Sequence, residues 1–232
     1  MVKRNTALWI RRTHRYLGIF LGLQFLMWTI SGLYFSWTNI DEIHGDQFKK
    51  DEKEVAYDSL PGLGKVSARF KITSLELKTI TGKPFYWVND SVLIDAKSGV
   101  VKSKVSKQEA LAIASEFMLD TLEVKSIELL TETNKHHEYR ERTLPAYVIT
   151  YNHPENVKAY VSVNDGKFQR VRHRSWRWFD FLWMTHTMDY EGRDDFNTTV
   201  LRVFSLLGLI TVLSGFILWF ISSPTIRKIL KK

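Results

Sequence analysis

Two long apolar stretches lie near the ends of the chain and flank a polar middle. The first runs from Leu17 to Trp37 without a formal charge. A helix of this length covers roughly 30 Å at ~1.5 Å per residue, the thickness of a bilayer's hydrocarbon core. The second runs from Val200 to Ile221 and is interrupted only by Arg202, whose long side chain can reach the headgroups. Each stretch predicts a membrane-spanning helix.

A cleaved signal peptide is the alternative for the first stretch. Such peptides have an apolar core of only ~7–15 residues, followed by small residues at a cleavage site. Here the stretch ends in Tyr34, Phe35 and Trp37, an aromatic belt typical of a membrane surface. We therefore expect an uncleaved anchor.

Between the spans, β-branched and aromatic runs alternate with turn residues, which predicts strands. Ser106 and Glu109 form a capping box before apolar residues at helical spacing, so one amphipathic helix is expected over 107–119. The expected strands cover 72–80, 85–88, 92–94, 100–101, 126–131, 146–151 and 158–163. The predicted fold class is α+β, with two transmembrane helices flanking a β-rich domain that has a central amphipathic helix.

The middle of the chain also contains a weak internal repeat. Segment 74–78 (SLELK) is similar to segment 126–130 (SIELL), and segment 93–99 parallels segment 161–166. Two similar β-rich units joined by a helix would explain this pattern. Chance similarity is the alternative, because the matching segments are short.

Charge is distributed unevenly along the 232 residues. The net charge is +8, yet all 25 Asp and Glu residues lie between Thr38 and Thr199, so the positive excess is in the two ends. Basic residues before the first span and after the second place both termini in the cytoplasm by the positive-inside rule. The middle then lies outside the inner membrane, which excludes nucleic acid as a partner. The chain has no cysteine, which excludes disulfides, thiolate chemistry and iron–sulfur sites.

Several motifs resemble a known family. The helix SKQEALAIASEF followed by strands is similar to the PepSY domain, and "HRYLG…SGLYFSW" with "LLGLITVLSGFILWF" resembles PepSY-associated transmembrane helices. That family includes iron-regulated membrane proteins and ferric-siderophore reductases, which usually have four spans and bind b-type haem through histidine. This chain has two predicted spans and resembles a short form.

The resemblance completes the expected organisation of the chain, and the spans with a cysteine-free exported domain predict a bacterial inner membrane. Residues 1–16 and 222–232 form basic cytoplasmic tails, residues 17–37 and 200–221 form the spans, residues 38–175 form a periplasmic PepSY-like domain with its stalk, and residues 176–199 form an aromatic interfacial segment.

The resemblance also indicates candidate haem ligands. His14 matches the family's histidine before its first span, and His186 matches its histidine before a later span; His44 leaves the first helix on the same side as His186. An imidazole can be an axial ligand of haem iron. His14 is the only histidine on the cytoplasmic side, so a bis-histidine site there requires a symmetric homodimer or a partner subunit. Without a cofactor, His14 faces headgroups and residues 176–190 form an amphipathic helix in the interface.

Other residues indicate weaker possibilities. Met184, His186 and Met188 are soft ligands suited to copper(I), although on a helix His186 points away from the two methionines. His136-His137-Glu138 is expected to be a solvent-exposed loop. Gly18-x-x-x-Gly22 permits close helix packing, Gln24 is expected to bond a neighbouring helix or a cofactor propionate, and the Ser31-Gly32 and Ser214-Gly215 pairs are interpreted as small packing residues.

A basic and aromatic segment precedes the second span, and it predicts contact with anionic lipid headgroups. Its members are Arg170, Arg172, Arg174, Trp176, Trp178 and Trp183.

Two functions of different classes follow. The first is a haem-b electron-transfer component, alone or in a complex, that passes electrons to a periplasmic acceptor such as a ferric chelate. The second is a non-enzymatic anchored module that binds or restrains a periplasmic or membrane partner. Hydrolase, kinase and dinucleotide-binding motifs are absent from the sequence.

Overall fold

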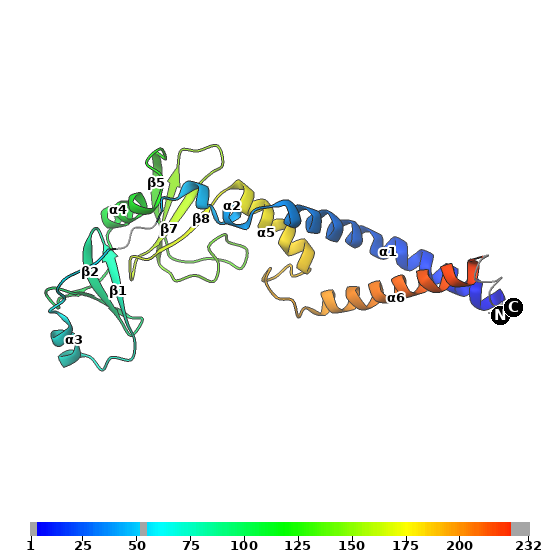
Figure 1. Cartoon of the computed structure of the whole chain (residues 1–232), viewed down its shortest axis with the longest axis horizontal. Helices are drawn as coiled ribbons and strands as arrows, with labels where there is room; N and C mark the ends of the chain where they lie inside the picture. The colour runs from blue at the N-terminus through cyan, green and yellow to red at the C-terminus, as the bar shows by residue number, and fades with distance from the viewer. Residues whose placement is uncertain (1–3, 52–54, 224–232) are drawn as a thin grey trace. The chain divides into compact units, whose positions relative to one another are not determined.

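The computed structural model describes residues 4–51 and 55–223. Lys3 and the predicted C-terminal basic residues lie outside these ranges. The chain divides into two compact units: residues 1–37 with 180–232, called the helical unit, and residues 38–179, called the β unit. Figure 1 shows the elements coloured along the chain.

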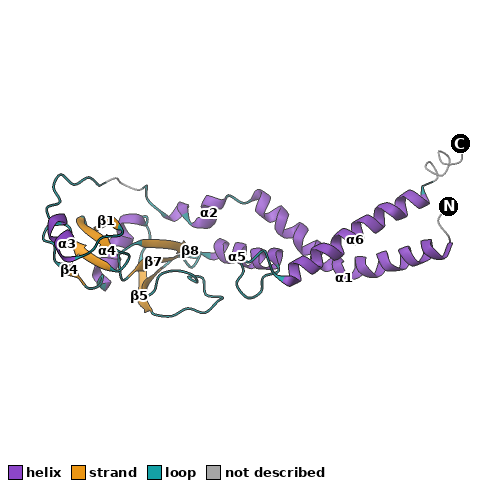
Figure 2. Cartoon of the chain, turned by 90° about the horizontal axis from the view of Figure 1, so that it is seen from below, coloured by secondary structure: helices purple, strands orange, loops and turns teal. Residues whose placement is uncertain are grey.

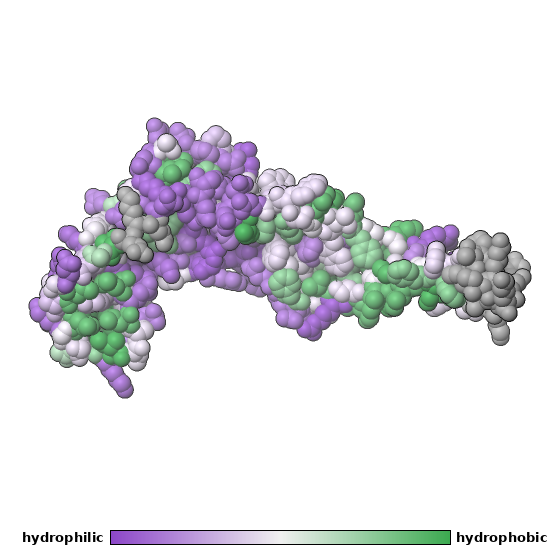
Figure 3. Space-filling view, viewed as in Figure 1, coloured by the Kyte–Doolittle hydropathy of each residue, from purple (hydrophilic) through white to green (hydrophobic). Residues whose placement is uncertain are grey.

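The helical unit is built on two long helices, α1 (Arg4–Trp37) and α6 (Thr199–Ser222), which lie side by side in Figures 1 and 2. They run antiparallel, with Phe20 stacked on Phe204 at 5.6 Å between ring centroids. In the most apolar 18-residue segment of each helix, only 11% is buried. Exposed side chains such as Ile19 and Phe216 leave an apolar surface over the helix pair (Figure 3), as expected for helices in contact with lipid.

Both helices are longer than the predicted spans. The second span was predicted within one residue of α6 at each end, and Thr198 caps that helix through the Leu201 N–H. α1 begins well before Leu17, because the preceding arginines and alanine are good helix formers. A helix can continue beyond the hydrocarbon core, so the predicted apolar stretch marks only part of α1.

The β unit contains two four-stranded antiparallel sheets, and in each the strands are neighbours in chain order. The first has β1 (Leu75–Ile80), β2 (Lys83–Val88), β3 (Val92–Asp95) and β4 (Val101–Lys102); the second has β5 (Val124–Leu130), β6 (Ala146–Tyr151), β7 (Lys158–Ser162) and β8 (Phe168–Arg172). The predicted strands are confirmed with shifted ends, whereas β8 was not predicted.

This topology confirms the internal repeat. The two similar segments 74–78 and 126–130 fall on β1 and β5, each the first strand of its sheet. The other matching pair leads into turns with Gly99 and Gly166 at φ values of 74° and 69°, a left-handed conformation that glycine adopts without strain. A helix precedes each sheet, α3 (Leu63–Arg69) and α4 (Lys107–Phe117), so each repeat is one helix followed by a four-stranded meander.

The main core of the β unit joins both sheets through α4. Ile113 of α4 packs in one buried cluster with Ile80 and Trp87 from the first sheet and Ile149 and Val161 from the second. The predicted capping box is present, with the Ser106 hydroxyl accepting from the Glu109 N–H at 3.2 Å and the Glu109 carboxylate accepting from the Ser106 N–H at 2.8 Å. The central amphipathic helix therefore begins where the sequence indicated.

Two short helices connect the end of α1 to this core, α2 (Ile40–His44) and the 3-10 helix η1 (Asp46–Phe48). The buried ring of His173 fixes them on the second sheet, donating from Nε2 to the Ile43 carbonyl at 3.2 Å. Burial lowers the pKa of His173, which favours the neutral form of the ring.

Candidate functional site

His14 lies on α1 against α6. Its Nδ1 is 2.8 Å from the Ser214 Oγ and 3.1 Å from the Thr211 carbonyl oxygen. A carbonyl only accepts hydrogen bonds, so Nδ1 carries a proton and Nε2 is the nitrogen that could bind a metal. No described residue bonds to Nε2.

Gly215 makes room for this ring. A Cβ at that position would lie 3.2 Å from the His14 Cε1 atom, closer than ordinary van der Waals contact. The Ser214-Gly215 pair therefore does two things for His14, because the serine bonds its Nδ1 and the glycine lets the imidazole approach the backbone of α6. A groove of about 440 Å³ lined by Val212, Gly215, Phe216 and Trp219 lies on the same helix.

His186 has a matching arrangement on α5 (Arg174–Thr187). Its Nδ1 is 2.7 Å from the Ser31 Oγ. The Ser31 hydroxyl also lies 2.6 Å from the Met27 carbonyl of its own helix. When the hydroxyl donates to that carbonyl, its oxygen accepts from Nδ1–H, and the ring then has the same tautomer as His14. No described residue bonds to the His186 Nε2.

α1 also fixes the backbone around His186. The Gln24 amide donates to the Thr185 carbonyl at 3.0 Å, and the Trp28 indole donates to the His186 carbonyl at 2.8 Å. These carbonyls lie at the end of α5, where no further helical N–H is available. The expectation that Gln24 bonds a neighbouring helix is confirmed. Phe35 completes the setting, with its ring edge-on to His186 at 5.6 Å.

The two histidines belong to two separate sites. His186 contacts Ser31, and at ~1.5 Å per residue the distance from His14 to Ser31 along α1 is roughly 26 Å. Two ligands of one iron lie only a few ångströms apart, so His14 and His186 of one chain cannot share a haem. His44 is exposed at the end of α2 in the β unit.

Both sites fit an axial haem ligand. A ligating histidine usually donates its other ring N–H to an oxygen, which fixes the tautomer and the ring orientation, and both rings meet this condition. Gly18, Gly22 and Gly32 of α1 have open space where a Cβ would point, so a flat group can approach that helix. Among the described residues no three His, Asp or Glu side chains are grouped to hold a metal ion.

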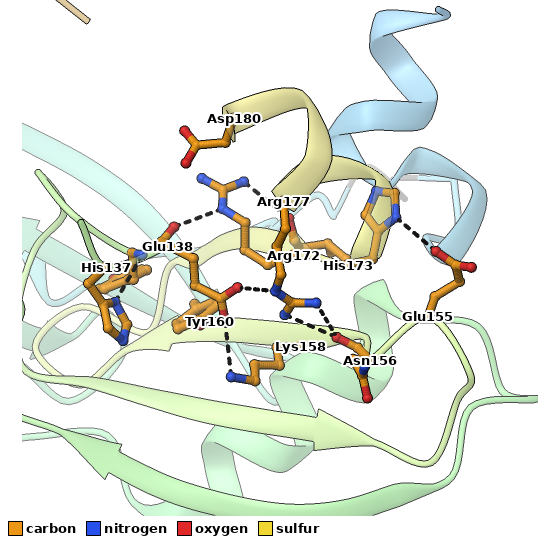
Figure 4. Close-up of polar contacts among 12 residues, drawn as sticks. His137, Glu138, Glu155, Asn156, Lys158, Tyr160, Arg172, His173, Arg177 and Asp180 are labelled. Atoms are coloured by element: carbon orange, nitrogen blue, oxygen red, sulfur yellow. Dashed lines mark hydrogen bonds and ion pairs between the residues drawn. The ribbon is translucent and has the colours of Figure 1, made fainter. Parts of the chain in front are cut away.

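The loop before β6 contains a polar cluster that the sequence did not indicate (Figure 4). The Glu138 side chain is only 13% exposed, so the expectation of a solvent-exposed His-His-Glu loop is wrong at this residue. Its carboxylate accepts from Arg177 Nε at 2.7 Å and from the Tyr160 hydroxyl at 2.7 Å, and lies 3.1 Å from Lys158 Nζ. Burial alone would raise the pKa of Glu138, but these bonds and the charges of Arg177 and Lys158 lower it to about 2.

Aromatic stacking completes this cluster. Tyr139 is fully buried and stacks on Tyr160 at 4.5 Å, and burial raises the pKa of Tyr139 to about 12. The cluster fixes loop 131–145 and the start of α5 on the second sheet. Its members bond one another, so we assign it a structural role.

The predicted lipid-contacting residues are divided between the interior and the surface. Arg172 and Trp176 are buried, with the guanidinium 3.8 Å from the ring centroid and Arg172 Nε donating to the Glu138 carbonyl. Trp178 is 58% exposed and Arg174 is exposed. Arg170 and Trp183 are half-buried. Lipid contact therefore stays a prediction for the exposed members, whereas the side chains of Arg172 and Trp176 are occupied within the β unit.

The serine partners of the histidines were missed, although the sequence contained a signal for them. The Ser-Gly pair occurs once in each predicted span, and each pair faces a histidine. The contacts join residues 155 and 200 positions apart, and no local pattern reports a pairing at that separation. The Glu138 cluster left no comparable signal, because the charged residues around it are common on surfaces.

Two lipid-exposed helices flanking an α+β domain define a membrane protein. The chain belongs to the PepSY-associated TM region family, whose model matches residues 2–221. Searches of curated proteins and of solved structures gave no significant match.

Proposed function

We propose that this protein is a haem-b electron-transfer component of a bacterial inner membrane, with its β unit in the periplasm. One observation carries the proposal: two imidazoles, roughly 26 Å apart along α1, each have Nδ1 within hydrogen-bond distance of a serine hydroxyl and no described partner at Nε2. A hydrogen bond from one ring nitrogen to an oxygen is usual for a histidine that ligates a metal through the other.

His14 and His186 would each bind haem iron through Nε2. The haem would supply reversible one-electron transfer. The residues of this chain hold each imidazole in one orientation, with Ser214 and Thr211 around His14, and Ser31 and Phe35 around His186.

A second copy of the chain would complete the sites. Each site has one histidine, so a haem held by two histidines would need the second one from another chain. A symmetric homodimer would bring His14 to His14 and His186 to His186, giving two haems in place of none in a monomer. A larger complex with a partner subunit is the other way to supply the missing ligands.

The acceptor would be a periplasmic oxidant such as a ferric chelate. The basic residues Arg11, Arg12 and Arg15 precede the apolar part of α1 and support a cytoplasmic N-terminus by the positive-inside rule. His14 is then near the cytoplasmic face and His186 near the periplasmic face, so reducing equivalents have a site at each side of the bilayer.

The test is an absorption spectrum of the detergent-purified protein, oxidised and then reduced with dithionite. We expect the α-band of b-type haem, with about half of it lost in His14→Ala and about half in His186→Ala. His44→Ala tests the remaining predicted ligand, and His136→Ala, which changes an exposed loop residue, is the matched control. A colourless, folded protein expressed with ample haem would refute the proposal.

A partner-binding module is the second candidate, and the edge strands of the β unit favour it. β1 and β5 each lie at the edge of a sheet and carry exposed leucines, Leu77 at 44% and Leu129 at 55%; an apolar patch is visible over the first sheet (Figure 3). Exposed edges can pair with another chain. A colourless protein that binds a partner through its β unit would support this function.

A further inference from the structure

Ser31 and Ser214 are bonded in a way that packing alone does not require. Each hydroxyl donates to a carbonyl of its own helix, Ser31 to Met27 at 2.6 Å and Ser214 to Thr211 at 2.7 Å. This bond is common for serine in helices and uses the only hydroxyl proton. The hydroxyl oxygen can still accept a hydrogen bond. In both cases it lies within hydrogen-bond distance of an imidazole Nδ1 on another helix.

We propose that Ser31 is a positioning residue that holds His186 in the Nδ1–H tautomer, so that Nε2 stays available to a metal centre, whereas at His14 the Thr211 carbonyl holds the same tautomer with or without Ser214. The inference rests on the proposed function and deepens it, because it names the residue that sets the ligand strength at the His186 site. A hydrogen bond from the distal ring nitrogen to an oxygen raises the basicity of a ligating imidazole.

The two sites differ in the number of acceptors around Nδ1, and this difference predicts which serine substitution changes the tautomer of its histidine. His14 has two possible acceptors for Nδ1, the Ser214 hydroxyl and the Thr211 carbonyl, whereas among the described residues His186 has only the Ser31 hydroxyl. Removing the Ser31 hydroxyl leaves His186 without an acceptor, and its tautomer is then free to change. Removing the Ser214 hydroxyl leaves the Thr211 carbonyl in place, so His14 keeps its proton on Nδ1.

Burial strengthens the effect at Ser31, which is fully buried between the helices. Water cannot replace the lost hydroxyl there, and a polar group without a partner is costly in an apolar setting. The large effect is therefore expected at His186 and the small one at His14, although both histidines contact a serine.

The experiment uses the full chain in detergent, labelled with ¹⁵N at histidine and without haem, at pH 8. The ¹⁵N shifts report which ring nitrogen carries the proton, and His14→Ala and His186→Ala assign the signals. We expect both rings in the Nδ1–H form in the wild type. Ser31→Ala shifts His186 toward the Nε2–H form, while Ser214→Ala leaves His14 unchanged.

Two further variants separate this role from packing. Ser31→Thr keeps an acceptor oxygen and is expected to restore the wild-type signal of His186. Ser36→Ala is the matched control, since the Ser36 hydroxyl is exposed on the same helix and donates to the Leu33 carbonyl of that helix. An unchanged His186 signal in Ser31→Ala, or an equal change in Ser36→Ala, overturns the inference.

The haem-loaded protein provides a second readout. Loss of a partner of a ligating group typically lowers affinity for the metal centre roughly 10–100-fold, so Ser31→Ala is expected to lose haem at the His186 site and to raise the midpoint potential there. Unchanged affinity and potential in a haem-binding protein overturn the inference and leave the proposed function intact. A protein that binds no haem but shows the expected ¹⁵N shifts refutes the proposed function and supports the role assigned to Ser31.

Discussion

Replacing Glu138 with glutamine is expected to destabilise the β unit by about 3 kcal/mol at neutral pH. The carboxylate bonds Arg177 and Tyr160 and lies beside Lys158, and these groups lower its pKa from the usual 4.5 to about 2. Each pH unit between the folded and unfolded pKa is worth about 1.4 kcal/mol of unfolding free energy. Glutamine has no charge and cannot satisfy both cations, which stay half-buried beside it.

The pH dependence has a definite sign. Because the folded pKa is the lower one, the stabilisation is fully present above pH 4.5 and is lost as the pH falls toward 2. At pH 3 the difference between the wild type and Glu138→Gln is expected to fall to roughly 1.4 kcal/mol. His173 also titrates in acid, but it is present in both proteins, so its contribution cancels in the difference.

The assay is urea unfolding of the full chain in detergent, followed by the β-sheet signal in circular dichroism at pH 7 and pH 3. Glu128→Gln is the matched control, because Glu128 is exposed on β5 of the same sheet, and it is expected to change stability by less than about 0.5 kcal/mol. Equal midpoints for Glu138→Gln and the wild type at pH 7 would refute the reasoning, as would a difference that does not shrink at pH 3.

Three further changes test the β unit by the same urea titration. Tyr139→Ala removes a fully buried ring and is expected to cost about 3–5 kcal/mol, whereas Tyr139→Phe loses only the bond to the Thr143 carbonyl, about 1 kcal/mol; equal losses would contradict the packing argument. Ser106→Ala removes the capping box of α4 at a cost of about 1 kcal/mol, and an unchanged midpoint would count against it. Gly166→Ala places a Cβ 3.0 Å from the Ile80 Cδ1 atom at a φ of 69° and is expected to cost at least about 1 kcal/mol; no loss would show that the turn relaxes.

The elements with strong local patterns were predictable from the sequence. The apolar run of α6 and the capping box of α4 each depend on neighbours within a few turns. β8 was missed because Phe168 to Arg172 alternates with basic residues, and the segment was interpreted as part of a headgroup-binding stretch. Its pairing with β7, a tertiary interaction, determines its conformation.

The sequence predicted the histidines of the candidate site but not the residues that contact them. His14 and His186 were indicated by the resemblance to a family whose histidines precede its spans. Their serine partners and the Glu138 cluster depend on the way two helices, or a loop and a sheet, come together. Such contacts follow from the packing of distant segments, which spacing along the chain does not report.

The two meanders of the β unit differ at their first hairpin. In the first sheet, β1 and β2 are joined by the tight turn Thr81-Gly82, whereas in the second sheet residues 131–145 connect β5 to β6. This longer connection supplies Tyr139, which stacks on Tyr160, and Glu138, which bonds Arg177 at the start of α5. The same four-stranded pattern therefore has a bare turn at one hairpin and, at the other, a segment that fastens the second sheet to the helix that follows it.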